Sequence, residues 1–597
     1  MKNSAATKEK RAYVDGDPGP ALDAGRSEAT ASVVAFEPDE RIAFARAFCH
    51  RMTAAWWRAI VSADRSAPPL RPPFDAVDGR SATTPALELA DKMGRLAAAL
   101  PLESAAYQIG LTYTGLLPSD YRSRHGIYYT PPALTSRLIE QATGAGVDWT
   151  RCRVLDPACG GGAFLAPVAR RIADALPDCE PGILIRNIAA RLRGYEIDSF
   201  AAWLAQVTLE AALLPAIRSS GQRLPLVVRV CDSLRDEAAH EQFDLVIGNP
   251  PYGRVKLNAH DRAVYRRSLY GHANLYGLFT DFALRQTRPD GHIAYVTPTS
   301  FLSGQYFRNL RALLLAEAPP VAIDFVSTRK GVFPDVLQET LLATYRKGAH
   351  TRKAIVNSIA VANRESATVE RVGSCTLPKA VSDPWLVPRD RGRRAFVDRL
   401  NRMPHRLSDW GYSVSTGPLV WNRHKGQFAE SPGERTYPVI WAEAISSDGW
   451  FSWRAQRRNH QPYFATAAGD DWLVTTEPCI LLQRTTAREQ QRRLIAAALP
   501  AEFLRRYRAV VVENHLNMIR PASAHPPVPS DVVAAFLNSA VADRVFRCIN
   551  GSVAVSAYEL EAMPLPSPDA LEELAALVAS RAERTSIDRV CNRLYAR

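Results

Sequence analysis

Apolar residues follow two spacings along this chain, and the change between them predicts its architecture. From about residue 36 to residue 120 they recur at helical spacing, as Ile42, Ala45 and Phe48 do. From about residue 121 to residue 350 short apolar runs alternate with helical patterns, which is typical of a parallel or mixed sheet covered by helices. We therefore expect a helical N-terminal lobe followed by an α/β domain.

The strands expected in the α/β domain are short, bulky apolar runs. They are Arg153 to Leu155, Leu192 to Tyr195, Val227 to Val230, Phe243 to Ile247, His292 to Val296 and Ala322 to Val326. The interval between the first two is roughly twice the usual one of about 20 residues. We expect an extra helix within Asp178 to Ile188 to account for it.

The remaining regions differ from this core in composition. Residues 1–35 have few large apolar side chains, so we expect a disordered arm there. Residues 385–566 are irregular and rich in arginine and aromatic side chains, and we expect a separate α+β recognition domain. The pattern of Leu571 to Tyr595 is amphipathic, which predicts a C-terminal helix within residues 567–597.

Charge narrows the class of partner. The chain has 74 Lys and Arg against 61 Asp and Glu, a net charge of +13, which favours a polyanion such as DNA, RNA or anionic lipid. Seven arginines stand between Trp385 and Arg406 against two aspartates. A solvated helix face is one interpretation of that run. Contacts to phosphates and bases are the other, because arginines and aromatics suit both.

Other features exclude several classes of protein. No apolar run approaches the roughly 20 residues that span a bilayer, and the charged N-terminus is not followed by an apolar segment, so we expect a cytoplasmic protein that does not enter a membrane. The nine cysteines lack paired ligand spacing. We therefore expect neither a disulfide framework nor a metal site, and we interpret the cysteines mostly as core residues.

The most informative motif follows the strand Phe243 to Ile247 and reads Asn249-Pro250-Pro251-Tyr252. Two prolines make this loop stiff and leave its carbonyls free to accept hydrogen bonds. The Asn249 side-chain oxygen and the Pro250 carbonyl could therefore hold one planar amino group and free its lone pair, while Tyr252 offers a flat face to the ring that carries it. A proline-rich turn after a buried strand is the alternative interpretation.

A second motif, Asp156 to Leu165, places an acid and three consecutive glycines between a strand and a helix. Glycines let the backbone approach a ligand closely. The spacing fits neither G-x-G-x-x-G nor a P-loop, which argues against NAD and ATP. An acid before the glycines suits a cationic ligand instead, and S-adenosylmethionine carries both a sulfonium and an ammonium.

Two further strands also end in acids. Glu196 ends one and could accept both hydroxyls of a ribose, with Asp198 as a close competitor. Asp232 follows the next and could accept from an adenine amino group. Strand ends at this edge of an open sheet face the ligand crevice, so the three acids together predict a nucleoside-type cofactor site.

Together these motifs resemble the gamma class of adenine-N6 DNA methyltransferases of bacterial restriction-modification systems. A segment like Gly126-Ile127-Tyr128-Tyr129-Thr130-Pro131-Pro132 precedes the glycine loop in that class, and a target-recognition region follows the catalytic sheet. The resemblance implies a Rossmann-like S-adenosylmethionine-dependent sheet that acts on an adenine flipped out of double-stranded DNA. A cognate restriction endonuclease is a further partner that it allows.

The resemblance assigns roles residue by residue. Phe333 would be a second aromatic that stacks on the base beside Tyr252. The cofactor would be bound by Thr130, Asp156, Ala158, Gly160, Phe164, Glu196 and Asp232. The DNA contacts that we expect in the arginine-rich region are Arg391, Arg393, Arg394, Arg423 and Lys425.

Three alternatives stay open at this point. The tetrad also occurs in methyltransferases that act on RNA bases or on glutamine amides of proteins, although the large basic C-terminal region favours DNA. A bifunctional enzyme that also cuts DNA is less favoured, because the N-terminal lobe carries no convincing Asp followed by Glu-x-Lys. A DNA-binding subunit without chemistry of its own is disfavoured by the intact tetrad.

Overall fold

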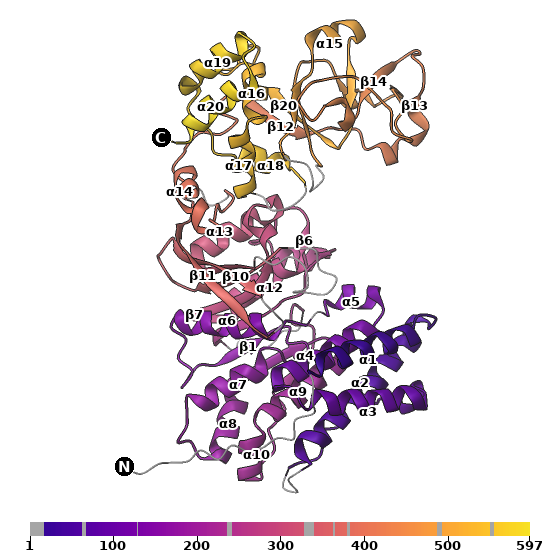
Figure 1. The fold of residues 1–597 in the computed structure, drawn as a ribbon, viewed down its shortest axis with the longest axis vertical. Helices are drawn as coiled ribbons and strands as arrows, with labels where there is room; N and C mark the ends of the chain where they lie inside the picture. Colours follow the sequence, from indigo (N-terminus) through magenta and orange to yellow (C-terminus); the bar gives the residue numbers. More distant parts are fainter. Residues whose placement is uncertain are drawn as a thin grey trace. The chain divides into compact units, whose positions relative to one another are not determined.

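A computed structural model of the protein describes residues 17–62, 67–127, 129–235, 242–326, 339–361, 365–378, 383–485, 492–549 and 554–596. The chain divides into two compact units, each built from discontinuous segments (Figure 1). The first comprises residues 1–298, 313–351 and 357–370, and the second comprises residues 299–312, 352–356 and 371–597.

The first unit begins with a helical lobe. Its helices are α1 (Gly19–Ser32), α2 (Pro38–Val61), α3 (Thr84–Ala97), α4 (Leu102–Leu116) and α5 (Ser119–His125). A capping box between Glu37 and Glu40 and a proline at the first turn fix the start of α2. Gly94 of α3 lies against α2, where an added Cβ would meet the Met52 carbonyl oxygen at 2.2 Å. The predicted lobe therefore exists, and a glycine sets its closest helix crossing.

The predicted disordered arm is partly wrong. Residues 19–32 form α1, which packs on α3 and α4 and buries Leu22 and Ala29 in the core of the lobe. Small residues supply most of this contact, so the scarcity of large apolar side chains was a misleading signal. Residues 1–16 lie outside the described part of the chain.

A large sheet forms the centre of the first unit. Its strand order is β11-β10-β8-β9-β7-β4-β1-β2-β3. The strands are β1 (Val154–Asp156), β2 (Leu192–Glu196), β3 (Val228–Val230), β4 (Phe243–Gly248), β7 (Thr287–Pro298), β8 (Pro320–Val326), β9 (Thr340–Arg346), β10 (Lys353–Val361) and β11 (Ala367–Thr376). Strands β7, β4, β1, β2 and β3 are parallel, and β9 pairs antiparallel with β7 and β8. The residues of β10 and β11 are divided between the two units.

Helices follow the strands as the alternating pattern predicted. They are α6 (Pro132–Gly144), α7 (Leu165–Asp174), α8 (Pro181–Arg191), α9 (Ser199–Ala212), α10 (Leu214–Ser220), α11 (Ala259–Val264), α12 (Leu275–Gln286) and α13 (Arg308–Glu317). Helix α8 is the extra helix that we expected in the long interval before β2. A small hairpin of β5 (Arg254–Val255) and β6 (Ala273–Asn274) follows the tetrad. The predicted methyltransferase-type α/β architecture is confirmed.

The second unit is α+β, as predicted. After α14 (Arg391–Leu400) it holds a four-stranded sheet of β12 (Tyr412–Thr416), β20 (Leu516–Pro521), β17 (Ile480–Gln483) and β18 (Ala496–Ala498). A five-stranded sheet contains β13 (Phe428–Ala429), β15 (Tyr463–Ala465), β14 (Thr436–Ile440), β19 (Val510–Val512) and β16 (Val474–Thr475). Its other helices are α15 (Ala501–Tyr507), α16 (Ser530–Leu537), α17 (Ala540–Ile549), α18 (Ala557–Glu561), α19 (Glu572–Ala579) and α20 (Arg584–Leu594).

The predicted single C-terminal helix is two helices. The chain breaks between α19 and α20, where Arg581 takes a left-handed φ of 53°. The Ala582 N–H then bonds the Leu577 carbonyl, which ends the first helix, and the two helices pack against each other.

Two predictions from composition can be compared with the described residues. Eight of the nine cysteines are buried and none forms a disulfide, in agreement with their interpretation as core residues. In the described part of the chain no single helix is long and apolar enough to span a membrane, although α9 and α10 together, bent by 68°, reach that length and apolarity.

Candidate active site

The tetrad and the acids converge on one edge of the sheet. Strands β4, β1, β2 and β3 are adjacent and parallel, so their carboxyl ends meet there. A cavity of about 860 Å³ opens at this edge, entirely within the first unit. Seven residues singled out from the sequence line it: Ala158, Gly160, Glu196, Asp232, Asn249, Pro251 and Tyr252.

Glu196, rather than Asp198, faces the cavity. The Glu196 carboxylate accepts from the backbone N–H groups of Gly160 and Asp198, both at 2.9 Å. The Asp198 side chain is buried away from the cavity wall, where it caps α9 and accepts from the hydroxyls of Tyr113 and Tyr121. Burial raises the pKa of Glu196 to about 7. Of the two acids that the sequence left open, Glu196 is therefore the one that lines the cavity.

Asp156 lies beneath the glycine loop and does not line the cavity. It is 1% exposed, and its Oδ1 accepts from the Ala158 N–H at 3.2 Å. Its Oδ2 is buried without a hydrogen-bond partner, and burial raises the pKa of the carboxyl to about 8. A buried acceptor without a donor is costly. This geometry suits a group that gains a partner or a cation when a ligand binds.

Two other predicted cofactor residues also lie off the cavity wall. Phe164 is 2% exposed and belongs to the hydrophobic core beneath α7. Thr130 contacts the tetrad instead, since its Oγ1 accepts from Asn249 Nδ2 at 3.1 Å. Asp232 is placed as expected, and its Oδ1 accepts from the Leu234 N–H at 3.1 Å.

The tetrad is a hydrogen-bonded unit rather than an open loop. The Tyr252 hydroxyl donates to Asn249 Oδ1 at 2.7 Å and lies 3.2 Å from the Val296 carbonyl oxygen. The Tyr252 ring meets the Tyr276 ring edge to face at 6.0 Å. Pro250 is buried, whereas Pro251 lines the cavity. The Asn249 oxygen that we expected to accept from a substrate amine thus already accepts from the Tyr252 hydroxyl.

The sequence reasoning missed a set of cations around the cavity. Arg124, Arg235, Arg254 and Lys256 line it together with the acids. Arg254 and Lys256 are exposed and stand two and four residues after Tyr252, on and beside the β5–β6 hairpin. Their closeness to the tetrad in the sequence was a signal that could have identified them. The cavity therefore combines carboxylates with cations that suit an anionic group.

The residues predicted to contact DNA lie in the second unit or outside the described residues. Phe333 falls in the undescribed segment 327–338. On α14, Arg393 pairs with Asp390 at 3.1 Å and Arg394 with Asp398 at 3.8 Å, and Arg391 donates to the Arg371 carbonyl. Arg423 and Lys425 occupy short 3-10 turns, with the Lys425 ammonium 5.5 Å from the Trp421 ring. Their roles stay predictions.

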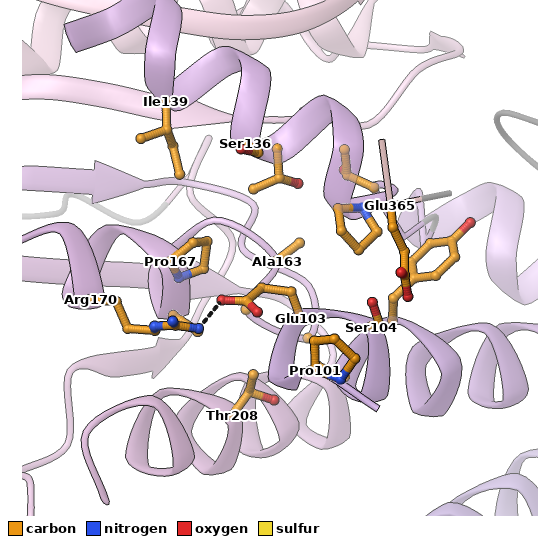
Figure 2. Close-up of a pocket in the computed structure, with 18 of the residues that line it drawn as sticks. Pro101, Glu103, Ser104, Ser136, Ile139, Ala163, Pro167, Arg170, Thr208 and Glu365 are labelled. Carbon is orange, nitrogen blue, oxygen red and sulfur yellow. Dashed lines mark hydrogen bonds and ion pairs between the residues drawn. The ribbon is translucent and has the colours of Figure 1, made fainter. Parts of the chain in front are cut away.

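A second hollow, of about 460 Å³, lies on the other side of the glycine loop (Figure 2). It is bounded by α4, α6, α7 and α9, and an ion pair of 2.6 Å between Glu103 and Arg170 crosses one end. Thr130 and Gly161 line it as well, and Tyr129 lines both hollows. Tyr129, Thr130 and the glycine loop therefore lie between the two hollows.

Comparison with known proteins agrees with this geometry. Residues 196–333 match the family model of Eco57I restriction-modification methylase. The chain is 28% identical over 365 residues to the type II methyltransferase M.PstI of Providencia stuartii, covering 59% of this chain and 70% of the relative. It is 26% identical over 352 residues to the type II methyltransferase M.BsuBI of Bacillus subtilis, covering 58% and 69%.

Among solved structures, the type IIL restriction-modification enzyme MmeI in complex with DNA is similar, with a TM-score of 0.57 at 12% identity over 97% of this chain and 95% of that one. This likeness concerns the fold alone and extends over both units. The predicted resemblance to methyltransferases of restriction-modification systems is confirmed.

Proposed function

We propose that this chain is a site-specific DNA methyltransferase that transfers a methyl group from S-adenosylmethionine to the N6 amino group of an adenine extruded from duplex DNA. The observation that carries the proposal is the single cavity in which Glu196 and Asp232 share a wall with Asn249 and Tyr252. A site for the cofactor and a site for a planar amine thus open into one space.

The residues at the acidic end fit S-adenosylmethionine. Glu196 would accept from the ribose hydroxyls and Asp232 from the adenine amino group, because both carboxylates line the cavity. Asp156, whose Oδ2 is buried without a partner and whose pKa burial raises to about 8, would ionise when the positively charged cofactor binds and would then contribute negative charge beneath it. When bound, the cofactor supplies an electrophilic methyl group.

The residues at the other end would prepare the amine. Asn249 Oδ1 and the Pro250 carbonyl would accept its two N–H groups, which localises the nitrogen lone pair. Tyr252 would stack on the base, and a few kcal/mol of extrusion cost would be offset by these contacts. Holding two reactants together lowers a barrier by about 7–11 kcal/mol in favourable cases, so positioning is the largest contribution.

Charge supports DNA as the polymer. The cations around the cavity suit the phosphates that flank an extruded nucleotide, and the net charge of +13 suits a polyanion as a whole. The similar structure MmeI is described in complex with DNA. A cognate restriction endonuclease would be the natural partner of such an enzyme.

The test is a competition among acceptors. Labelled methyl from S-adenosylmethionine is offered to the purified chain with duplex DNA, structured RNA or a protein fraction. We expect label in DNA alone. Label in RNA or protein alone, with the cofactor bound, would refute the proposed substrate.

A further inference from the structure

Thr130 lies in the segment whose resemblance implied a cofactor contact, yet its hydroxyl bonds the catalytic tetrad. It is 4% exposed and lines the hollow behind the glycine loop rather than the cofactor cavity. Its Oγ1 accepts from Asn249 Nδ2 at 3.1 Å, while Asn249 Oδ1 at the other end of the amide accepts from Tyr252 at 2.7 Å. The two ends of the Asn249 side chain are therefore held by different partners.

The segment that carries Thr130 is held rigidly against the tetrad. Gly126 has a left-handed φ of 64° and lies so close to Pro251 that an added Cβ would fall 2.1 Å from the Pro251 Cβ. The Tyr129 ring packs between Gly110 of α4 and Gly161 of the glycine loop, where added Cβ atoms would meet it at 2.2 and 2.4 Å. Thr130 is followed by two prolines that restrict its backbone and start α6.

Amide orientation decides whether Asn249 can act. An asparagine presents an acceptor at one end and two donors at the other, and the two ends are nearly equal in size. Rotated by 180°, the side chain would present N–H groups to the substrate amine and could accept nothing from it. Two partners together favour the productive orientation: the Tyr252 hydroxyl donates to Oδ1 at 2.7 Å, and the Thr130 hydroxyl accepts from Nδ2 at 3.1 Å.

We infer that Thr130 is a positioning residue: its hydroxyl, bonded to Nδ2 while the Tyr252 hydroxyl is bonded to Oδ1, holds the Asn249 amide in the orientation that offers Oδ1 to the substrate amine. The inference rests on the proposed function for its consequence and on the hydrogen bond between Thr130 and Asn249 for its cause. It assigns the segment before α6 to the alignment of the acceptor for the amine.

The first test compares Thr130→Val, which keeps the shape and removes the hydroxyl, with Thr130→Ser, which keeps the hydroxyl. We expect kcat for DNA methylation to fall about tenfold in the valine variant, the effect of one hydrogen bond. KM for DNA and Kd for the cofactor should stay within about twofold, and the serine variant should retain most of the activity. Unchanged kcat in Thr130→Val, or a loss explained entirely by weaker cofactor binding, would overturn the inference.

The same substitution in an Asn249→Asp protein distinguishes a positioning role of Thr130 from general damage to the fold. In Asn249→Asp both ends of the side chain are acceptors, so there is no orientation to lose. Adding Thr130→Val to that variant should lower its residual kcat by less than about threefold. An equal loss in both backgrounds would show that the threonine acts on the fold, and it would overturn the inference.

A structural measurement decides the inference even without catalysis. Neutron crystal structures of the wild-type and Thr130→Val proteins, which distinguish the amide nitrogen from the oxygen, should show Asn249 Nδ2 bonded to residue 130 in the first and the amide reoriented in the second. An identical Asn249 conformation in both would refute the inference. Failure of the wild-type chain to methylate DNA would instead refute the proposed function, and the crystal structures would still test the role of Thr130.

Discussion

Asn249 and Tyr252 contribute separable parts of the proposed chemistry. Asn249→Ala removes the acceptor for the amine, so we expect methylation to fall at least about a hundredfold, as for other groups that bind a developing charge. Cofactor affinity should not change, since Glu196 and Asp232 are intact. Calorimetry with S-adenosylmethionine and a methyl-transfer assay measure the two quantities, and full activity in this variant would refute the role of the tetrad.

Tyr252 provides a matched pair of variants for the stacking role. Tyr252→Phe keeps the ring but loses the hydrogen bond to Asn249 Oδ1, so its methylation rate should fall only by about tenfold, as in Thr130→Val. Tyr252→Ala removes the ring and should be strongly impaired. A phenylalanine variant as inactive as the alanine variant would show that the hydroxyl, rather than the aromatic face, is required.

The raised pKa of Glu196 predicts that cofactor affinity depends on pH. Only the ionised carboxylate can accept from both ribose hydroxyls, and burial holds the pKa of the free protein near 7. Affinity should therefore rise with pH, by about tenfold between pH 6 and pH 8, and binding near pH 7 should release a proton. Calorimetry in two buffers of different ionisation enthalpy measures both effects. Glu196→Gln should lose the part of the pH dependence centred near pH 7 and keep the part due to Asp156, whose pKa is about 8. An unchanged dependence in that variant would assign the effect near pH 7 to another group.

Some of these residues could be predicted from sequence and others could not. The tetrad, Glu196 and Asp232 follow buried parallel strands, whose carboxyl ends meet by necessity at one edge. The hydrogen bond between Thr130 and Asn249 joins residues that are 119 positions apart. A Thr-Pro-Pro sequence does not indicate whether the threonine contacts a cofactor or another side chain. Asp156 was correctly placed at its strand end, but the packing of the glycine loop turned it away from the cavity wall.

At the scale of elements, one helix crossing gives a stability prediction. Gly94→Ala would push a methyl group into the backbone of α2, so we expect the free energy of unfolding to fall by roughly 1–3 kcal/mol. Gly144, at the end of α6, has no atom within 4 Å of its added Cβ. Gly144→Ala is therefore the control, with an expected change within about 1 kcal/mol. Chemical denaturation of both variants measures the difference, and equal effects would contradict the close crossing of α2 and α3.

Elements were predicted well where periodicity was strong and poorly where composition was ambiguous. The buried strands and α8 followed from runs of large apolar residues. Helix α1 was missed because it buries only one large apolar side chain, Leu22, beside Gly25 and Ala29, and a segment of such composition is typical of disorder. The break between α19 and α20 was missed because a left-handed arginine carries no local signal of the kind that a glycine gives.

At the scale of the whole molecule, the two units are interleaved along the chain. Arg311, which is fully buried, belongs to the second unit although it precedes β8. It donates to the carbonyls of Phe301 and Gly304, both at 2.8 Å, and to the Tyr558 hydroxyl. Local sequence patterns do not show that residues 299–312 and 352–356 belong to the second unit. The sequence therefore predicted a single boundary at residue 385, which is incomplete.

The assignment of Arg311 to the second unit predicts that this unit can be damaged alone. Arg311→Met leaves buried carbonyls without donors at roughly 1–3 kcal/mol each, so the second unit should lose stability and DNA affinity should fall. Cofactor affinity should persist because the cavity lies in the first unit. Hydrogen exchange of α17 and α18 measures the stability of the second unit. Calorimetry measures the affinities for DNA and for the cofactor. Arg505→Met, an exposed arginine of the same unit, is the control. Equal loss of cofactor binding would contradict independent units.

The most direct test of the account is nucleoside analysis of duplex DNA that the purified chain has methylated with labelled S-adenosylmethionine. We expect N6-methyladenine at one recurrent sequence and none with Asn249→Ala. Label on cytosine, or bound cofactor with no label in DNA, would contradict the assignment of the tetrad to an adenine amine.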